Sequence, residues 1–306
     1  LTSAFNFERP NDEPLPTLAG RKTKAEADAL TAAQQTMPSI VPTADAALPV
    51  QTTGVRPSRA LPYELHTSAR SDSLNGRVQL LFANSGRAAA VFHVYDKLHL
   101  SDSLPRRYAV EPGKQLDGYW NAMTDNAGLY DLWVLGPNGF HRQFKGDLNR
   151  LRAGGAAAPE IRVGYDARRG DIYLQMRNDG RRDCRFTVQS NKAYPRPDAY
   201  QAGGKGRHED REDDDNDRRH DNDRNNNHGD HGNNGIYRPH PDGSWRVRVK
   251  GGGDTAMRWS LDASGQWYDF VVTCDADPSF YRRFAGRIET GRHSVSDPAM
   301  GLPDRF

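Results

Sequence analysis

The sequence lacks both a long apolar run and a large excess of charge of one sign. No stretch approaches the roughly 18 consecutive apolar residues that a membrane-spanning helix needs, and only 36% of the 306 residues are hydrophobic. The 42 Lys and Arg residues nearly balance the 40 Asp and Glu residues, which leaves a net charge of +2. A helical membrane protein is therefore excluded, and nucleic acid is not an expected partner because there is no broad basic field.

The chain also lacks an initiating Met and the apolar segment of a signal peptide. It starts at Leu1. We expect it to be a piece of a longer protein that was cut or matured upstream. The missing signal peptide then says nothing about the compartment.

Residues 203–235 lack every aliphatic and aromatic side chain. Such a segment cannot bury apolar surface to offset the entropy of ordering, so we predict a solvated, disordered insertion. Four histidines lie among its acidic residues, and a loose metal-binding loop is the functional alternative: His208, His220, His228 and His231. A calcium loop at 221–232 is rejected because it has no Gly at the sixth position and no Glu at the twelfth.

The rest of the chain divides by composition. Residues 1–20 hold a short apolar cluster followed by turn residues, and residues 21–36 are rich in Ala, Glu, Lys and Gln, which predicts a helix. The residues from there to 62 are rich in Pro and small side chains, so 21–62 are interpreted as a helix and a linker. After Tyr63, short alternating apolar runs separated by Gly, Asn and Asp predict strands and turns.

The β-rich part contains a tandem repeat. Asn84, Gly86, Phe92 and Val94 are matched by Asn178, Gly180, Phe186 and Val188 at a constant offset of 94. Val110, Gly113 and Trp120 are matched at an offset of 139 by Val249, Gly252 and Trp259. The polar insertion accounts for most of the change in offset. We therefore predict repeats at 63–152 and 160–301, with the insertion inside the second.

About seven short strands in each repeat indicate an all-β protein made of two tandem immunoglobulin-like antiparallel β-sandwiches, preceded by the short helical and linker segment. A small barrel is the alternative architecture.

Five runs carry a resemblance to a known family: VFHVYD (91–96), RRYAVEPGKQL (106–116), YDLWVLGPNGFHRQFKGDL (130–148), WYDF (267–270) and FYRRFAGRIETGRHSVSDPAMG (280–301). They resemble the tandem C-terminal domains of the large secreted, phosphocholine-preferring phospholipases C of Gram-negative bacteria, haemolytic and non-haemolytic. The resemblance covers about 240 residues from Leu61 to Gly301. The opening LTSAFNF resembles the last strand-forming segment of that family's catalytic domain, so 1–20 would be its remnant. The polar insertion is not part of the family pattern.

The resemblance implies a parent enzyme that hydrolyses phosphatidylcholine, and in some members sphingomyelin, to phosphocholine and a neutral lipid. Its metal-dependent catalytic domain would lie N-terminal to this chain, with the nucleophile and the divalent metal there. That domain is the expected partner of this chain, together with a phospholipid surface. Export by the twin-arginine route would place the parent in the periplasm or outside the cell.

No catalytic, cofactor or metal site is predicted in this chain. His293, Ser294 and Asp297 lie close together in sequence, but a catalytic triad converges in space from distant segments, so the favoured interpretation is a C-terminal turn that packs back on the parent enzyme. Arginine pairs such as 281–284 (YRRF) offer phosphate-binding chemistry, and a solvated strand face is the favoured explanation.

Two aromatic residues are candidates for contact with lipid headgroups. Trp133 and Phe140 flank a Pro-Asn-Gly turn, and aromatic rings suit the boundary between lipid and water. Trp133 also alternates with Leu132 and Val134, which favours core packing instead.

The two cysteines, Cys184 and Cys274, both lie in the second repeat, on strands placed like the two that an immunoglobulin-type disulfide joins. The hypothesis is a Cys184–Cys274 bridge that spans the sheets in an oxidising compartment. Two free buried thiols are the competing expectation.

Three functions are compatible with these observations. In the first, the chain is the non-catalytic C-terminal region of a secreted phospholipase C and acts in structural support or lipid-surface docking. In the second, it is an independent adhesion or binding module without an enzyme. In the third, the tandem contains an unrecognised hydrolytic site. The first is favoured by the family resemblance.

Overall fold

The computed structural model describes residues 23–38, 52–101, 103–152, 155–202, 235–302 and 306. The chain divides into two compact units, Leu1–Val50 and Gln51–Phe306. The predicted remnant at 1–20 and residues 39–51 of the predicted linker lie outside the described residues. No helix in the described ranges is both long and apolar enough to cross a membrane.

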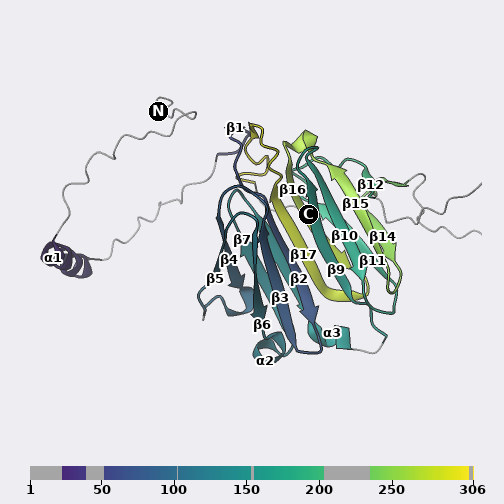
Figure 1. Cartoon of the computed structure of the whole chain (residues 1–306), viewed down its shortest axis with the longest axis horizontal. Helices are drawn as coiled ribbons and strands as arrows, with labels where there is room; N and C mark the ends of the chain where they lie inside the picture. The colour runs from purple at the N-terminus through teal and green to yellow at the C-terminus, as the bar shows by residue number, and fades with distance from the viewer. Residues whose placement is uncertain (1–22, 39–51, 102, 153–154, 203–234, 303–305) are drawn as a thin grey trace, which may run out of the picture. The chain divides into compact units, whose positions relative to one another are not determined.

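The first unit contains the predicted helix, which is confirmed as α1 (Lys24–Gln35) (Figure 1). Its N-terminus is fixed by a capping box. The Thr23 side chain accepts from the Glu26 backbone N–H at 3.3 Å, and the Glu26 carboxylate accepts from the Thr23 backbone N–H at 2.7 Å. No residue of α1 is buried, so capping and propensity rather than packing support this helix.

The second unit is built from strands whose side chains alternate between buried and exposed. Its first half contains β2 (Leu65–Asp72), β3 (Arg77–Asn84), β4 (Ala90–Asp96), β5 (Arg106–Val110), β6 (Lys114–Trp120), β7 (Leu129–Leu135) and β8 (His141–Asp147). Short helical turns join them: η1 (Lys97–His99), α2 (Ala122–Asn126) and α3 (Leu148–Arg152).

The second half contains β9 (Pro159–Asp166), β10 (Asp171–Asn178), β11 (Cys184–Ser190), β12 (Ala199–Gln201), β13 (Ile236–Tyr237), β14 (Ser244–Val249), β15 (Asp254–Ser260), η3 (Asp262–Ser264), β16 (Trp267–Cys274) and β17 (Asp277–Arg287). A two-stranded sheet of β1 (Pro57–Ser58) and β18 (Ser294–Val295) joins the start and the end of the unit.

The predicted tandem repeat is confirmed in the strand order. One sheet of the first half is β2-β3-β6, and the corresponding sheet of the second half contains β9-β10-β15. The facing sheets run β5-β4-β7-β8 and β14-β11-β16-β17. Each half is therefore a two-layered antiparallel sandwich, and the barrel alternative is wrong. The fourth strand of the first repeat, β5, pairs with β4 in the sheet that contains β7. In a constant-type immunoglobulin domain, the fourth strand instead belongs to the other sheet, which corresponds to the sheet of β6 here.

The repeated Asn-x-Gly motif connects the two layers of each sandwich. Buried Asn84 donates to the carbonyls of Ala88 and Val110 at 2.8 and 3.0 Å, and its side-chain oxygen accepts from the Gly86 N–H at 2.9 Å. Asn178 makes the same kinds of contact in the second repeat, including 2.7 Å to the Arg182 carbonyl. These bonds satisfy carbonyls that the ladders leave unpaired, which explains why the motif recurs.

The two repeats are fused, a feature that the sequence analysis did not predict. β8 pairs with β17 in antiparallel register, so the second sheet of each repeat becomes half of one eight-stranded sheet. In Figure 1, β17 runs through the middle of the unit, between the strands of the first repeat and those of the second. The buried apolar residues of both halves form one core.

The polar insertion leaves and re-enters the fold between two paired strands. β12 and β13 pair antiparallel, with Ala199 opposite Tyr237 and Tyr200 opposite Ile236. The insertion is therefore connected to β12 and β13 at the edge of their sheet, outside the strands that form the sandwich. Residues 203–234 themselves, including the four histidines, lie outside the described residues.

Candidate functional site at the junction of the two repeats

The junction is organised around a pseudo-twofold axis in the β8–β17 ladder. Arg142 lies opposite Phe284 and Arg282 lies opposite Phe144, and both arginines occupy the same position in their own repeat. The Phe144 and Phe284 rings meet edge to face with centroids 6.2 Å apart. Both guanidinium groups lie in the core, with Arg142 0% and Arg282 1% exposed. The expectation of a solvated face for 281–284 is wrong for Arg282, because this side chain points inward.

Arg282 is neutralised by a carboxylate. Its Nε and Nη2 atoms donate to the two carboxylate oxygens of Glu160 at 2.9 and 3.0 Å. Nη2 also donates to the Tyr130 hydroxyl at 3.0 Å, and Nη1 donates to the Lys145 carbonyl at 2.7 Å. This bidentate pair satisfies the buried charge and ties β9 to β17.

Arg142 has polar partners but no carboxylate among the described residues. Its Nη1 donates to the carbonyls of Ala285 and His141 at 2.6 and 2.7 Å. Its Nη2 donates to the hydroxyl groups of Tyr268, at 2.7 Å, and Tyr165. Burial raises the pKa of Tyr165 well above its usual range, so this hydroxyl stays neutral. The first-repeat counterpart of Glu160 is His66, which explains the missing carboxylate.

His66 carries a lowered pKa. Burial is the main cause, the Arg142 charge adds to it, and the Glu64 carboxylate opposes it. The imidazole is therefore neutral at pH 7, and its Nε2 lies 2.8 Å from the Ser85 hydroxyl. A neutral ring beside a buried guanidinium avoids a second positive charge at this position.

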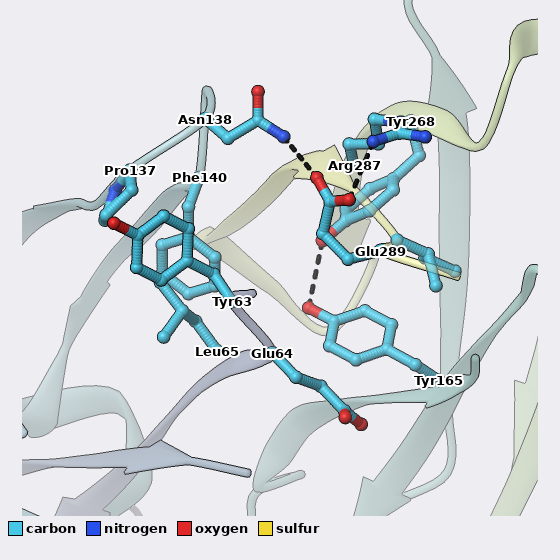
Figure 2. A pocket seen from close by; sticks show the side chains of 11 residues that line it. Tyr63, Glu64, Leu65, Pro137, Asn138, Phe140, Tyr165, Tyr268, Arg287 and Glu289 are labelled. Carbon is cyan, nitrogen blue, oxygen red and sulfur yellow. Dashed lines mark hydrogen bonds and ion pairs between the residues drawn. The ribbon is translucent and has the colours of Figure 1, made fainter. Parts of the chain in front are cut away.

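A small pocket lies between the β7–β8 turn and the end of β17, and the two tyrosines that bind Arg142 line it (Figure 2). Glu289 organises its polar side: it accepts from Asn138 Nδ2 at 2.6 Å, from Arg287 Nη1 at 2.8 Å and from the Leu61 N–H at 3.1 Å. The wall also includes Tyr165 and Tyr268, whose hydroxyls are 2.9 Å apart. The free volume is about 20 Å³, room for roughly one water molecule.

This pocket contains no nucleophile beside a base. The Glu289 carboxylate is paired with Arg287, and the Tyr165 and Tyr268 hydroxyls bind each other and accept from Arg142. In the described ranges, no three His, Cys, Asp or Glu side chains group closely enough to hold a metal ion. The arrangement holds the repeats together and has the chemistry of a structural junction.

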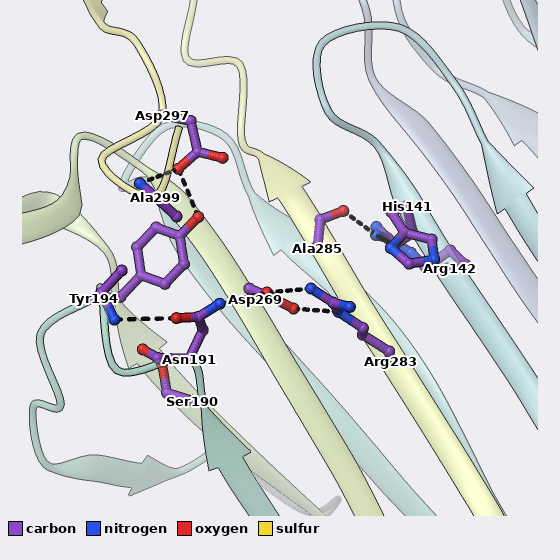
Figure 3. A network of polar contacts seen from close by, with 11 residues as sticks. His141, Arg142, Ser190, Asn191, Tyr194, Asp269, Arg283, Ala285, Asp297 and Ala299 are labelled. Atoms are coloured by element: carbon purple, nitrogen blue, oxygen red, sulfur yellow. Dashed lines mark hydrogen bonds and ion pairs between the residues drawn. The ribbon is translucent and has the colours of Figure 1, made fainter. Parts of the chain in front are cut away.

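The residues of the sequence motif at 293–297 do not converge. His293 Nδ1 accepts from the Ala60 N–H at 3.2 Å, and the Ser294 hydroxyl donates to the Gly265 carbonyl at 3.2 Å. Asp297 accepts from the Tyr194 hydroxyl at 2.6 Å and from the Ala299 N–H at 2.8 Å (Figure 3). These side chains fix the C-terminal segment to other parts of this chain, and packing of the turn on the parent enzyme stays a prediction.

The two aromatic candidates for lipid contact are both covered. Phe140 is 7% exposed, and its ring lies 5.6 Å from that of Phe92 and 4.0 Å from the Arg142 guanidinium. Trp133 lies on the outer sheet face, half-buried, with the Lys97 ammonium 3.9 Å from its ring centre. An exposed interfacial ring is therefore wrong for Phe140, and for Trp133 a lysine occupies the ring face that lipid would meet. Core packing of Trp133 is also wrong, since its neighbours in β7 point the other way.

Cys184 and Cys274 are free buried thiols in the structure. They lie on β11 and β16, which are neighbours in the eight-stranded sheet. The prediction that the two cysteines lie on different sheets is therefore wrong. A hydrogen bond between the two thiols, together with burial, raises the pKa of Cys184. The structure therefore matches the competing expectation of two free thiols, and a bridge between these neighbouring strands stays an untested hypothesis.

Sequence reasoning missed the paired arginines, although the signal was present. HRQFKG (141–146) and YRRFAG (281–286) align with Arg142 on Arg282 and Phe144 on Phe284. In a strand, an arginine two residues from a buried phenylalanine lies on the same face. That alternation predicts an inward-pointing guanidinium.

Comparisons with known proteins agree with this architecture. The family model described as bacterial phospholipase C, C-terminal domain, matches residues 57–147, 159–221 and 224–287. The non-hemolytic phospholipase C of Pseudomonas aeruginosa is 39% identical over 99% of this chain and 36% of its own length. The protein of the same name in Burkholderia pseudomallei is 36% identical over 98% of this chain and 35% of its own length. The hemolytic phospholipase C of P. aeruginosa is 30% identical over 83% of this chain. The chain thus spans about a third of the length of these relatives.

Proposed function

Because this chain belongs to the family of bacterial phospholipase C C-terminal domains, we propose that it is the non-catalytic C-terminal region of a phospholipase C. The observation that carries the proposal is the alignment of nearly the whole chain with only a third of each relative. A catalytic domain N-terminal to these residues would perform the hydrolysis and would hold the divalent metal. The parent would be secreted or periplasmic, exported by the twin-arginine route.

The proposed reaction of the parent is cleavage of phosphatidylcholine, and of sphingomyelin as a second substrate, to phosphocholine and a neutral lipid. The side chains of this chain that suit such chemistry are engaged elsewhere. Ser294 and His293 bind backbone groups of other segments, and Arg142 and Arg282 are buried at the junction. These contacts support a role outside the reaction.

Within that role, structural support of the catalytic domain is the first proposal and docking on a phospholipid surface is the second. The fused eight-stranded sheet and the buried Arg282–Glu160 pair favour a rigid body. Docking through Trp133 and Phe140 is disfavoured by the Lys97 contact and by burial. Docking would need other side chains.

The proposal is tested by comparing hydrolysis by the isolated chain with hydrolysis by the complete protein. The isolated chain is assayed on phosphatidylcholine vesicles and on p-nitrophenyl-phosphorylcholine, with the complete protein as the positive control. We expect no turnover above background from the isolated chain. In the complete protein, Ser294→Ala should leave the rate per folded molecule unchanged. Turnover by the isolated chain, or its loss in Ser294→Ala, would establish a hydrolytic site here.

Docking is tested by sedimentation with phosphatidylcholine vesicles and with sugar-lipid vesicles as control. Binding to neither would remove docking and leave structural support. An independent adhesion module is the competing function, and it would be favoured if deleting this chain left the stability and the activity of the complete protein unchanged.

A further inference from the structure

A second pocket lies within the second sandwich, at the end of β15 and the start of β16. Its free volume is about 170 Å³, close to the size of an engineered cavity that binds benzene. Five aromatic residues contribute to its wall, and each is at most 7% exposed: Tyr194, Trp259, Trp267, Tyr268 and Phe270. Such a pocket takes a compact ligand with an apolar surface.

The walls are held in place by the C-terminal segment. Trp267 Nε1 donates to the Val295 carbonyl at 2.9 Å, and the Tyr194 hydroxyl donates to Asp297 at 2.6 Å (Figure 3). Behind Tyr194, Asn191 donates to Asp269 at 3.1 Å, and Asp269 is paired with Arg283. The pocket is therefore preformed, so a ligand would not need to order these rings.

The charges at this pocket have one sign. Its lining contains no Lys, Arg or His side chain, whereas Asp262 of η3 lies at its mouth. Among the described residues, the Asp262 carboxylate accepts only long hydrogen bonds of 3.4 Å, from Ser260 and Gln266. Aromatic faces and an exposed carboxylate both attract a cation.

The first repeat supplies a cation that the second lacks. Trp120, the counterpart of Trp259, is covered by the Arg106 guanidinium 4.5 Å from its ring centre. At the offset of 139, Arg106 corresponds to Trp245, whose ring meets that of Trp259 edge to face at 5.5 Å. The second repeat thus has a buried aromatic ring where the first has an exposed cation, and its pocket lies beside Trp259.

We propose that this pocket binds a small organic cation, an ammonium group that carries apolar substituents. The apolar substituents contact the aromatic rings that line the pocket, and the positive charge lies against the ring faces. The Asp262 carboxylate at the mouth attracts the same charge. A protonated guanidinium or primary ammonium is a poorer ligand, because its several donors would lose water against aromatic walls that offer few acceptors besides Asp262. The inference is independent of the proposed function.

The test is calorimetric titration of the chain with tetramethylammonium, with tert-butanol as an uncharged ligand of similar shape. We expect saturable binding of tetramethylammonium in the millimolar range, a change in tryptophan fluorescence, and no binding of tert-butanol. Ala263→Phe, which adds a ring at the mouth, should abolish binding, whereas Ala109→Phe on β5 should not.

The charge is tested by Asp262→Asn, which should weaken binding by about fivefold, the loss expected for one exposed opposite charge. Asp254→Asn makes the same change at the far end of β15 and should have no effect. Equal binding of both probes would assign an uncharged apolar ligand and overturn the proposal. It would also be overturned by absence of tetramethylammonium binding in a chain with native circular dichroism.

Discussion

The buried Arg282–Glu160 pair allows the fused junction to be tested by a single atom change. Glu160→Gln keeps the shape of the side chain and removes its charge, which leaves Arg282 in the core without a counter-ion. Removing one partner of a buried ion pair costs about 3–5 kcal/mol. Here the Glu160 side chain is 18% exposed, and Arg282 keeps Tyr130 and the Lys145 carbonyl as acceptors. We therefore expect a loss of about 2–3 kcal/mol in the free energy of unfolding, at or just below the bottom of that range.

The matched control is His66→Gln, because His66 occupies the equivalent position of the first repeat and forms no ion pair with Arg142. Its loss at pH 7.5 should stay below about 1 kcal/mol, as for an ordinary neutral hydrogen bond. Urea unfolding followed by tryptophan fluorescence measures both. For Glu160→Gln, the loss of about 2–3 kcal/mol corresponds to a fall in Tm of roughly 5–10 °C in a unit of this size. Equal losses in the two variants, or a loss under about 0.5 kcal/mol in Glu160→Gln, would refute the electrostatic account of the junction.

Three further predictions concern other parts of the fold. Gly180→Ala should cost about 2–3 kcal/mol, because a Cβ atom there would collide with the Ala156 carbonyl, and a near-neutral value in urea unfolding would contradict this. The lowered pKa of His66 makes the unfolded state bind more protons, so stability should fall as the pH drops from 7.5 through 6.5. His66→Gln should flatten that slope, and an unchanged slope would assign it to another group. In denatured protein without reductant, thiol titration should find two reactive groups from Cys184 and Cys274; none would mean that the pair is oxidised.

The sandwich repeats are predictable from the sequence because their signals are local. Alternating apolar residues set the strands, and the Asn-x-Gly motif recurs because Asn84 and Asn178 satisfy the same carbonyls in each copy. The offsets of 94 and 139 therefore align strands that occupy equivalent places in the two sandwiches.

The fusion of the repeats is not predictable in this way. It depends on two edge strands, β8 and β17, that meet about 140 residues apart in sequence, and no local pattern reports which edges pair. The same pairing turns Arg142 and Arg282 into core residues, whereas composition alone suggests a solvated face. The carboxylate for Arg282 comes from β9, on a third segment of the chain, so the ion pair exists only once the junction has formed.

The central claim is that two copies of one sandwich form a single cooperative body. Differential scanning calorimetry of the chain tests it most directly, by comparing the calorimetric enthalpy with the van't Hoff enthalpy. The account predicts one transition, with the two enthalpies equal at roughly 150 kcal/mol near 60 °C for the described part of the second unit. Two resolved transitions, or a van't Hoff enthalpy near half the calorimetric value, would show that the repeats unfold separately and would contradict the claim.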